Sequence, residues 1–313
     1  MMFTVTFAVD NVCKMVVKYK KTEVINMKLG ITDGACSRYG NETYNKIKAL
    51  GYDTVDFGMA NTETELYKME EKDFIECLTK EKEIIEKAGL EVFQVHGPWR
   101  CPPRDFEDAD RLDRLEKMKK SIRGTAALGC KYWVIHPIMP YGVEDLGTEN
   151  QEKTWQLNKE FFTEILAEAK KYGVTVCFEN MPFLKFSIST PEQIMAFVEE
   201  MNDDNFKVCL DTGHVNVFKG KTVADAVRIF GDKLCVLHCH DNDGNGDRHS
   251  LPYFGTIDWE EFCKALCEIG YDGSFSLECA PPSKLPNELY DAYNEVLFQT
   301  AKKLTSSFAK KKK

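Results

Sequence analysis

Eight short runs of β-branched and other apolar residues alternate with longer stretches of helical spacing, and this alternation limits the fold more than any other feature. Apolar residues between the runs recur three and four positions apart, as in Ile194, Phe197 and Val198, which is typical of amphipathic helices. Strands that alternate with helices predict a parallel sheet. The predicted strands are 28–33, 54–58, 91–96, 132–136, 175–179, 207–211, 234–240 and 274–278.

A glycine follows several predicted helices directly before the next strand, as at Gly51, Gly89 and Gly173. Glycine is favoured after a helix C-terminus because it adopts the left-handed conformation without steric cost. Eight strand–helix units match a single (β/α)₈ barrel, a TIM barrel of the α/β class, in number and length. The alternative, a doubly wound open sheet, would carry a glycine-rich phosphate-binding turn after an early strand, and the sequence has none.

The predicted barrel spans residues 27–304 as one catalytic domain. Met27 directly precedes the first clean strand, so residues 1–26 are interpreted as an N-terminal extension outside the fold. This stretch lacks a basic segment ahead of its apolar residues and does not predict a secretory signal. Residues 305–313 end in four lysines and are predicted to form a disordered tail.

Charge and cysteine usage bear on partners and compartment. The net charge is −9, and lysines concentrate at both ends, so the body is more acidic than the whole. An acidic body disfavours binding to nucleic acid or to an anionic membrane, and no apolar run is long enough to span a membrane. Several of the twelve cysteines, including Cys177, Cys209 and Cys235, lie in apolar runs, and no CxxC pair occurs. Buried free thiols indicate a reducing, cytoplasmic location.

Metal-binding side chains gather where the predicted strands end. Four of the six histidines stand at or just past a strand end, and carboxylates end three strands. These ends meet at one mouth of a barrel, where clustered carboxylates and imidazoles are costly without a cation. The histidines are His96, His136, His214, His238, His240 and His249, and the carboxylates are Glu179, Asp211 and Glu278.

The smallest set that could hold a metal is Glu179, Asp211, His238 and Glu278. Three oxygen donors and one nitrogen donor favour Mn²⁺, with Mg²⁺, Co²⁺ or Zn²⁺ as alternatives, over a structural zinc site. His240 follows His238 by two residues and faces the same side of a strand, so it is the alternative nitrogen ligand.

Several short motifs together resemble the xylose isomerase-like sugar phosphate isomerase/epimerase superfamily, whose members are (β/α)₈ barrels. The resemblance covers essentially all of the predicted barrel. The motifs are VHGPW at 95–99, IHP at 135–137, FEN at 178–180, LDTGH at 210–214, HCHDNDG at 238–244, DRH at 247–249, GTIDW at 255–259 and SLE at 276–278.

The resemblance implies roles for particular residues. In the ketose 3-epimerase and hydroxypyruvate isomerase branches, the residues that match Glu179, Asp211, His238 and Glu278 hold one divalent metal. The two that match Glu179 and Glu278 also act as acid and base. His214 and Arg248 match substrate contacts, and Trp99 is interpreted as a wall of the substrate pocket. The family also implies a homodimer by analogy.

The same superfamily includes endonuclease IV, a three-zinc DNA repair enzyme, and positions matching its ligands are occupied here. The additional candidates for metal or substrate binding are His96, His136, His214, Asp247, Arg248 and His249. The acidic body and the stretch at 30–40, which replaces the expected endonuclease sequence, argue against DNA binding.

We therefore expect a metal-dependent isomerase or epimerase of a small sugar, polyol or sugar phosphate. Glu179 and Glu278 would transfer a proton through a metal-stabilised enediolate. A lyase, a dehydratase or a C-glycoside-cleaving enzyme on the same scaffold is the alternative. The sequence leaves open the sugar, its phosphorylation and the choice between isomerisation and epimerisation.

Overall fold

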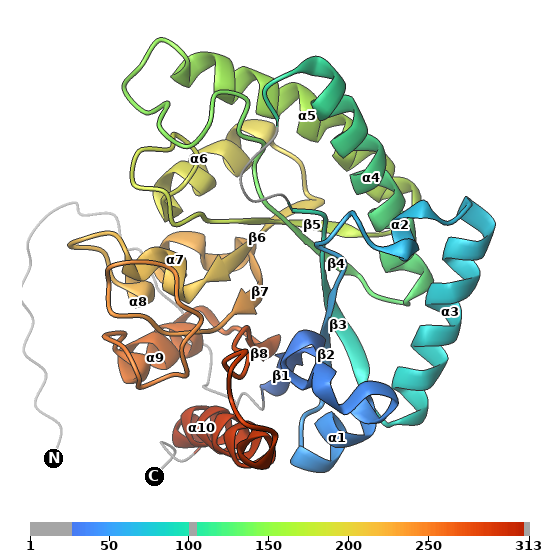
Figure 1. The fold of residues 1–313 in the computed structure, drawn as a ribbon. Coiled ribbons are helices and arrows are strands. Elements are labelled where there is room, and N and C mark those ends of the chain that lie inside the picture. The colour runs from blue at the N-terminus through green and yellow to red at the C-terminus, as the bar shows by residue number, and fades with distance from the viewer. Residues whose placement is uncertain (1–26, 100–104, 310–313) are drawn as a thin grey trace, which may run out of the picture.

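The computed structural model describes residues 27–99 and 105–309, and it confirms the predicted (β/α)₈ barrel (Figure 1). All pairings between the strands are parallel, in the order β7-β6-β5-β4-β3-β2-β1-β8. The strands are β1 (Lys28–Thr32), β2 (Thr54–Gly58), β3 (Glu91–His96), β4 (Tyr132–Ile135), β5 (Thr175–Glu179), β6 (Phe206–Asp211), β7 (Leu234–His238) and β8 (Ser274–Leu277).

The barrel closes just beyond β7 rather than along it. Cys239 N donates to Ser276 O at 2.8 Å, and Glu278 N donates to Cys239 O at 3.1 Å. The seam between the last two strands therefore lies at the carboxyl end of the barrel, hereafter the mouth. It fixes the backbone that leads into Glu278.

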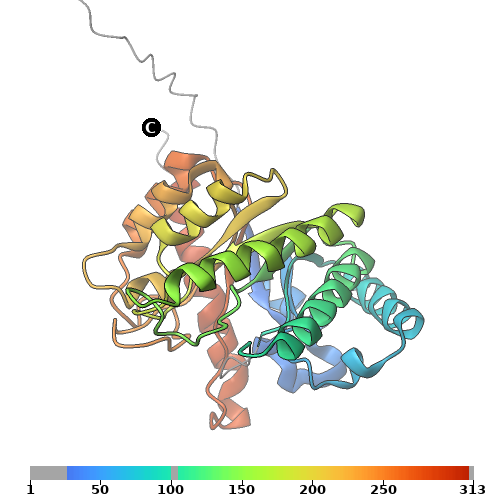
Figure 2. The ribbon, with the colours of Figure 1, turned by 90° about the horizontal axis from the view of Figure 1, so that it is seen from above.

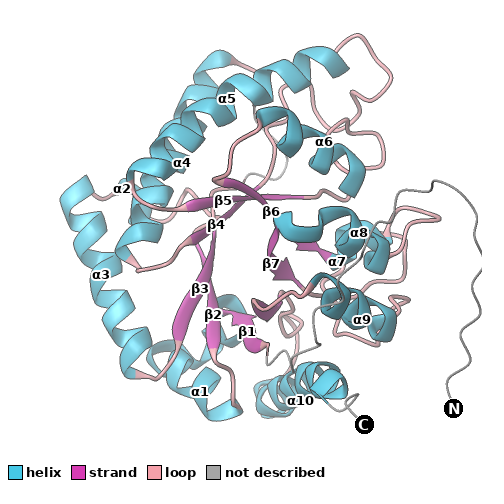
Figure 3. Cartoon of the chain, turned by 180° about the vertical axis from the view of Figure 1, so that it is seen from behind, coloured by secondary structure: helices cyan, strands magenta, loops and turns pink. Residues whose placement is uncertain are grey.

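Helices surround the sheet on its outside, as seen from behind in Figure 3. The view turned by 90° shows the cyan and teal helices on one side of the molecule, the yellow and orange helices on the other, and the light-green helix crossing between them (Figure 2). The helices are α1 (Thr43–Leu50), α2 (Glu65–Lys68), α3 (Glu71–Lys87), α4 (Asp108–Ala127), α5 (Gln151–Lys171), α6 (Pro191–Met201), α7 (Thr212–Asn216), α8 (Val223–Phe230), α9 (Trp259–Ile269) and α10 (Tyr290–Ala309), with 3₁₀ turns η1 (Asp33–Glu42), η2 (Gly231–Lys233) and η3 (Asn287–Leu289).

Local sequence signals explain where several helices begin and end. Thr190 and Gln193 form a reciprocal capping box at the start of α6, followed by Pro191 in the first turn. Gly51 ends α1 at φ 113°, in the left-handed region that the sequence predicts for this junction.

The core between the sheet and the helices is rich in aromatic rings. Phe162 of α5 lies 4.8 Å from Phe178 and 5.7 Å from Phe206, measured between ring centroids, so it packs on β5 and β6. Inside the barrel, Val134, Cys177, Cys209 and Val236 form a small apolar cluster. The predicted burial of Cys177 and Cys209 is confirmed, Cys235 is half-buried, and the described cysteines are free thiols.

The chain ends differ in part from the predicted boundaries. Residues 1–26, predicted to be an extension, lie outside the described residues, as do 310–313. Helix α10 continues to Ala309, beyond the predicted boundary at 304. Among the described helices, none has the length and apolar character needed to cross a membrane.

Candidate active site

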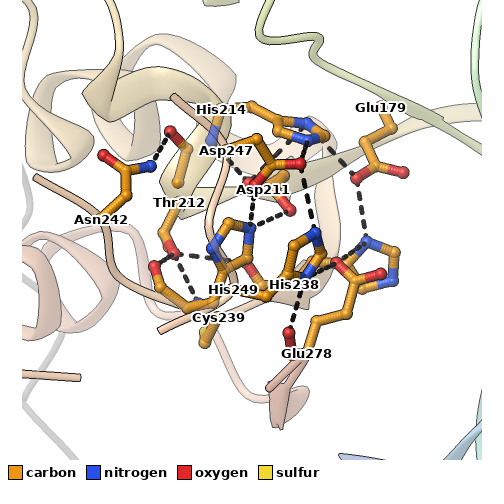
Figure 4. Close-up of polar contacts among 12 residues, drawn as sticks. Glu179, Asp211, Thr212, His214, His238, Cys239, Asn242, Asp247, His249 and Glu278 are labelled. Carbon is orange, nitrogen blue, oxygen red and sulfur yellow. Dashed lines mark hydrogen bonds and ion pairs between the residues drawn. The ribbon is translucent and has the colours of Figure 1, made fainter. Parts of the chain in front are cut away.

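Adjacent strands carry the predicted ligands to the mouth (Figure 4). Glu179, Asp211 and His238 are the last residues of β5, β6 and β7, and Glu278 directly follows β8. Asn180 fixes the relative height of the first two, because its side chain accepts from Asp211 N at 2.9 Å and donates to Asp211 O at 3.0 Å. The asparagine of the FEN motif thus joins the end of β5 to the end of β6, beside the two carboxylates.

His238 is the point at which two of the predicted carboxylates meet. Its Nδ1 lies 2.9 Å from Glu179 Oε1 and 3.4 Å from Glu278 Oε2. The imidazole and Glu179 are fully buried, whereas the side chain of Glu278 is 21% exposed. Glu278 therefore lies on the solvent side of this group, and Glu179 lies beneath it.

Asp211 faces a different histidine. Its Oδ2 lies 3.0 Å from His240 Nε2, and its Oδ1 accepts from His214 N at 2.7 Å as the N-cap of α7. Because β6 runs directly into α7, this cap also brings the His214 ring to 3.7 Å from Asp211. The two histidines of the HCH motif thus contact different members of the predicted ligand set. His238 contacts Glu179 and Glu278, whereas His240 contacts Asp211.

Gly213 makes room for His240. A Cβ atom at this position would lie 2.0 Å from His240 Cε1, which is closer than two carbon atoms can approach. His240 Nε2 is also 3.5 Å from Asp247 Oδ1, and its ring stacks on His249 at 4.1 Å between centroids. The LDTGH motif therefore needs its glycine for side-chain packing at the mouth.

The additional histidines extend the cluster in two directions. On one side, His136 Nε2 donates to Glu179 Oε2 at 2.9 Å, and His96 Nε2 is 3.9 Å from the same oxygen. Trp99 lies edge-on to His136, with ring centroids 5.3 Å apart, so the predicted wall residue adjoins the site.

On the other side, Asp247 connects two imidazoles. Its Oδ2 is 3.3 Å from His214 Nε2 and 3.2 Å from His249 Nε2. Arg248 differs from these neighbours, because its Nε donates to Asp243 and its side chain is 55% exposed. The structure thus brings the predicted histidines and carboxylates together but directs Arg248 to a surface ion pair.

The electrostatics show how these buried acids are neutralised. Burial alone would raise the pKa of Glu179, but His238 and His136 outweigh it and hold that pKa well below its usual range. Burial raises the pKa of Glu278 above its usual value, despite nearby imidazoles. The pKa of His214 rises to about 10, because Asp211 and other carboxylates outweigh its burial. The pKa of His238 is likewise raised by nearby carboxylates, whereas burial lowers the pKa of His136 to about 4, so the positive charge beside the carboxylates comes from some of the imidazoles and not from all of them.

The donor chemistry fits a divalent cation. Three of the groups that offer ligand atoms within 4.8 Å of one another are His96 with His136 and Glu179, His96 with His238 and Glu278, and, separately, Asp211 with His214 and His240. A buried ring nitrogen of each of His136, His238 and His240 has no hydrogen-bond partner among the described residues. Mixed imidazole and carboxylate donors at this spacing suit Mn²⁺, Co²⁺ or Zn²⁺.

Two buried carboxylates at or beside the site were not predicted from the sequence. Asp56 of β2 is buried, and its Oδ2 lies 2.9 Å from His238 Nε2. Asp241 accepts hydrogen bonds from Trp259 Nε1 and from the backbone of the 241–258 loop. The available signal for Asp56 was an acidic residue at the centre of an otherwise apolar strand.

The chain belongs to the xylose isomerase-like TIM-barrel family. The family model matches residues 44–297. This match confirms the superfamily to which the motifs point.

The relatives with assigned names include D-psicose 3-epimerases and inosose isomerases. The chain is 31% identical to D-psicose 3-epimerase of Ruminiclostridium cellulolyticum over 54% of this chain and 53% of that protein. It is 26% identical to D-psicose 3-epimerase of Enterocloster bolteae over 83% of this chain and 85% of that protein. The crystal structure of a D-tagatose 3-epimerase-like protein aligns with a TM-score of 0.70 at 23% identity, covering 90% of this chain and 99% of the other. The sequence relatives support the predicted enzyme class, and the structural match supports the fold.

Proposed function

We propose that this protein is a divalent-metal-dependent isomerase or epimerase of a small sugar or sugar phosphate. The observation that carries the proposal is the placement of Glu179 and Glu278 at 2.9 and 3.4 Å from one nitrogen of His238. Two carboxylates beside one nitrogen donor form both a cation site and an acid–base pair. The likeness to two D-psicose 3-epimerases supports a ketose as the substrate.

Glu179, Asp211, His238 and Glu278 would hold the metal, with Mn²⁺ as the expected ion. When bound, such a cation polarises a carbonyl and a neighbouring hydroxyl, which acidifies the adjacent C–H bond. Glu179, buried and ionised beneath His238 and Glu278, removes that proton. Glu278, whose pKa is raised by burial, is suited to deliver a proton.

The remaining residues would orient the substrate. His214 donates from Nδ1 to Asn180 O at 2.8 Å, which fixes its ring beside Asp211 and Asp247 at the mouth. To donate to a substrate hydroxyl, this ring would exchange Asp247 for the substrate at Nε2. Trp99 closes one wall, where an aromatic face can pack on a sugar ring. Proton return on the opposite face of the same carbon gives epimerisation, and return to the next carbon gives isomerisation.

A second candidate is a three-metal nuclease. Two further groups of ligand atoms favour it, because each could hold another ion. One is His96 with His136 and Glu179, and the other is His240 with Asp247 and His249. The metal content of the purified protein separates the two functions. About one Mn or Co per chain supports the sugar enzyme, and about three Zn per chain supports the nuclease.

Proton exchange tests the sugar reaction directly. The protein loaded with Mn²⁺ is incubated in D₂O with ketoses, ketose phosphates and inososes, and loss of the C–H signal is followed by proton NMR. We expect exchange with at least one class of substrate and its loss in Glu179→Gln. Glu199→Gln, an exposed position on α6, is the matched control. Exchange that persists in Glu179→Gln would overturn the acid–base assignment.

A further inference from the structure

We propose that Asp56 is a positioning residue that holds His238 in the orientation needed to bind the metal. This inference rests on the proposed function, because it concerns the same metal site. Asp56 lies on β2, and the ring it contacts ends β7. These strands are not neighbours in the sheet, so the contact crosses the interior of the barrel.

Asp56 contacts the side of the imidazole that faces away from the other carboxylates. His238 Nε2 lies 2.9 Å from Asp56 Oδ2, while Nδ1 faces Glu179 and Glu278. A histidine that binds a metal through one ring nitrogen commonly gives the proton on its other nitrogen to a carboxylate, which fixes the ring plane and the tautomer. Asp56 occupies the place of that carboxylate: its Oδ2 lies within ion-pair distance of Nε2, without the alignment of a hydrogen bond, and Nδ1 is left as the ligand atom.

Gln94 in turn holds Asp56. Its Nε2 donates to Asp56 Oδ2 at 3.0 Å and to Leu237 O, next to His238, at 3.1 Å. Gln94 is fully buried, and it belongs to β3. The amide therefore ties the carboxylate to the strand that carries the histidine, so a shift of Asp56 relative to β7 would cost hydrogen bonds.

The cost of this arrangement supports a functional role. Asp56 is 3% exposed, and its Oδ1 has no hydrogen-bond partner among the described residues. A buried carboxylate with one unpaired oxygen is unfavourable compared with an apolar side chain of similar size. A purely structural role does not explain a carboxylate at this position, whereas orientation of a metal ligand does.

The experiment measures Mn²⁺ affinity by calorimetric titration of the folded protein, with circular dichroism as the check on folding. We expect Asp56→Ala to lower the affinity about 10- to 100-fold. Asp56→Asn, which keeps the shape of the side chain but removes its charge, should also lower the Mn²⁺ affinity. This variant replaces Asp56→Ala in the test if the alanine variant does not fold. The matched control is Thr54→Val on the same strand, because Thr54 bonds Ser274 and is not among the contacts of His238.

A double-mutant cycle separates positioning from general destabilisation. In a His238→Ala background, Asp56→Ala should change Mn²⁺ affinity by less than about twofold, because the ring it orients is gone. An equal loss in both backgrounds, or wild-type affinity in a folded Asp56→Ala protein, would overturn the inference. If the wild-type protein itself binds no Mn²⁺, the proposed function fails instead.

Discussion

Asp241 secures the loop that brings Asp247 and His249 to the mouth, so removal of its charge is a sharp test of how the site is held. Its Oδ2 accepts from Trp259 Nε1 at 2.8 Å and from Tyr253 N at 3.0 Å. Its Oδ1 accepts from Asn242 N at 2.9 Å and from Ile257 N at 3.3 Å. The side chain is fully buried, so water cannot replace these bonds.

The Asp241→Asn substitution keeps the shape but turns one acceptor oxygen into an NH₂ group. In either orientation of the amide, two N–H donors then face another donor. Each hydrogen bond to a charged group contributes about 1.5–3 kcal/mol, so the loss of two predicts a fall of about 3–6 kcal/mol in the free energy of unfolding.

Urea-induced unfolding, followed by tryptophan fluorescence, measures this difference. Asp243→Asn is the matched control in the same loop, because Asp243 is exposed and bonds mainly to Arg248 and to the local backbone. We expect no measurable change for the control. A loss below about 1 kcal/mol for Asp241→Asn would refute the reasoning, because it would mean that the four bonds do not hold the loop.

Three further predictions concern the site and its surroundings. Gly213→Ala should displace His240 and lower kcat/KM on the order of 100-fold with an unchanged circular dichroism spectrum, and normal activity would contradict the packing argument. Arg114→Met leaves the buried carboxylate of Asp105 without its ion pair and should cost about 3–5 kcal/mol in urea unfolding, while a loss near zero would show that Asp105 finds another partner. His238→Ala should reduce bound Mn²⁺ more than His240→Ala, and the reverse order would move the nitrogen ligand to His240.

Most of the fold follows from the periodicity of the sequence. The predicted strands at 54–58, 91–96 and 175–179 match β2, β3 and β5 residue for residue. Such runs are recognisable because strands buried on both faces are rich in β-branched and other apolar residues, even where a polar residue interrupts them. The presence of carboxylates and histidines at strand ends likewise predicted the cluster at the mouth.

The end of β7 shows what local patterns miss. The sequence predicted a strand to residue 240, whereas β7 ends at His238. Cys239 then pairs with β8, and His240 N donates to Thr212 Oγ1 at 2.9 Å. These long-range partners turn His240 towards Asp211, so the two histidines face different carboxylates, which a strand pattern alone does not reveal. Asp56 was missed for the same reason, because its partner lies across the barrel.

A crystal of the protein soaked with Mn²⁺ and measured at a wavelength where manganese scatters anomalously tests the central claim most directly. The account predicts an anomalous peak at the mouth, within bonding distance of His238 Nδ1, Glu179, Asp211 and Glu278. A well-diffracting crystal that shows no anomalous peak at these groups, or that holds manganese only at other residues, would contradict the account.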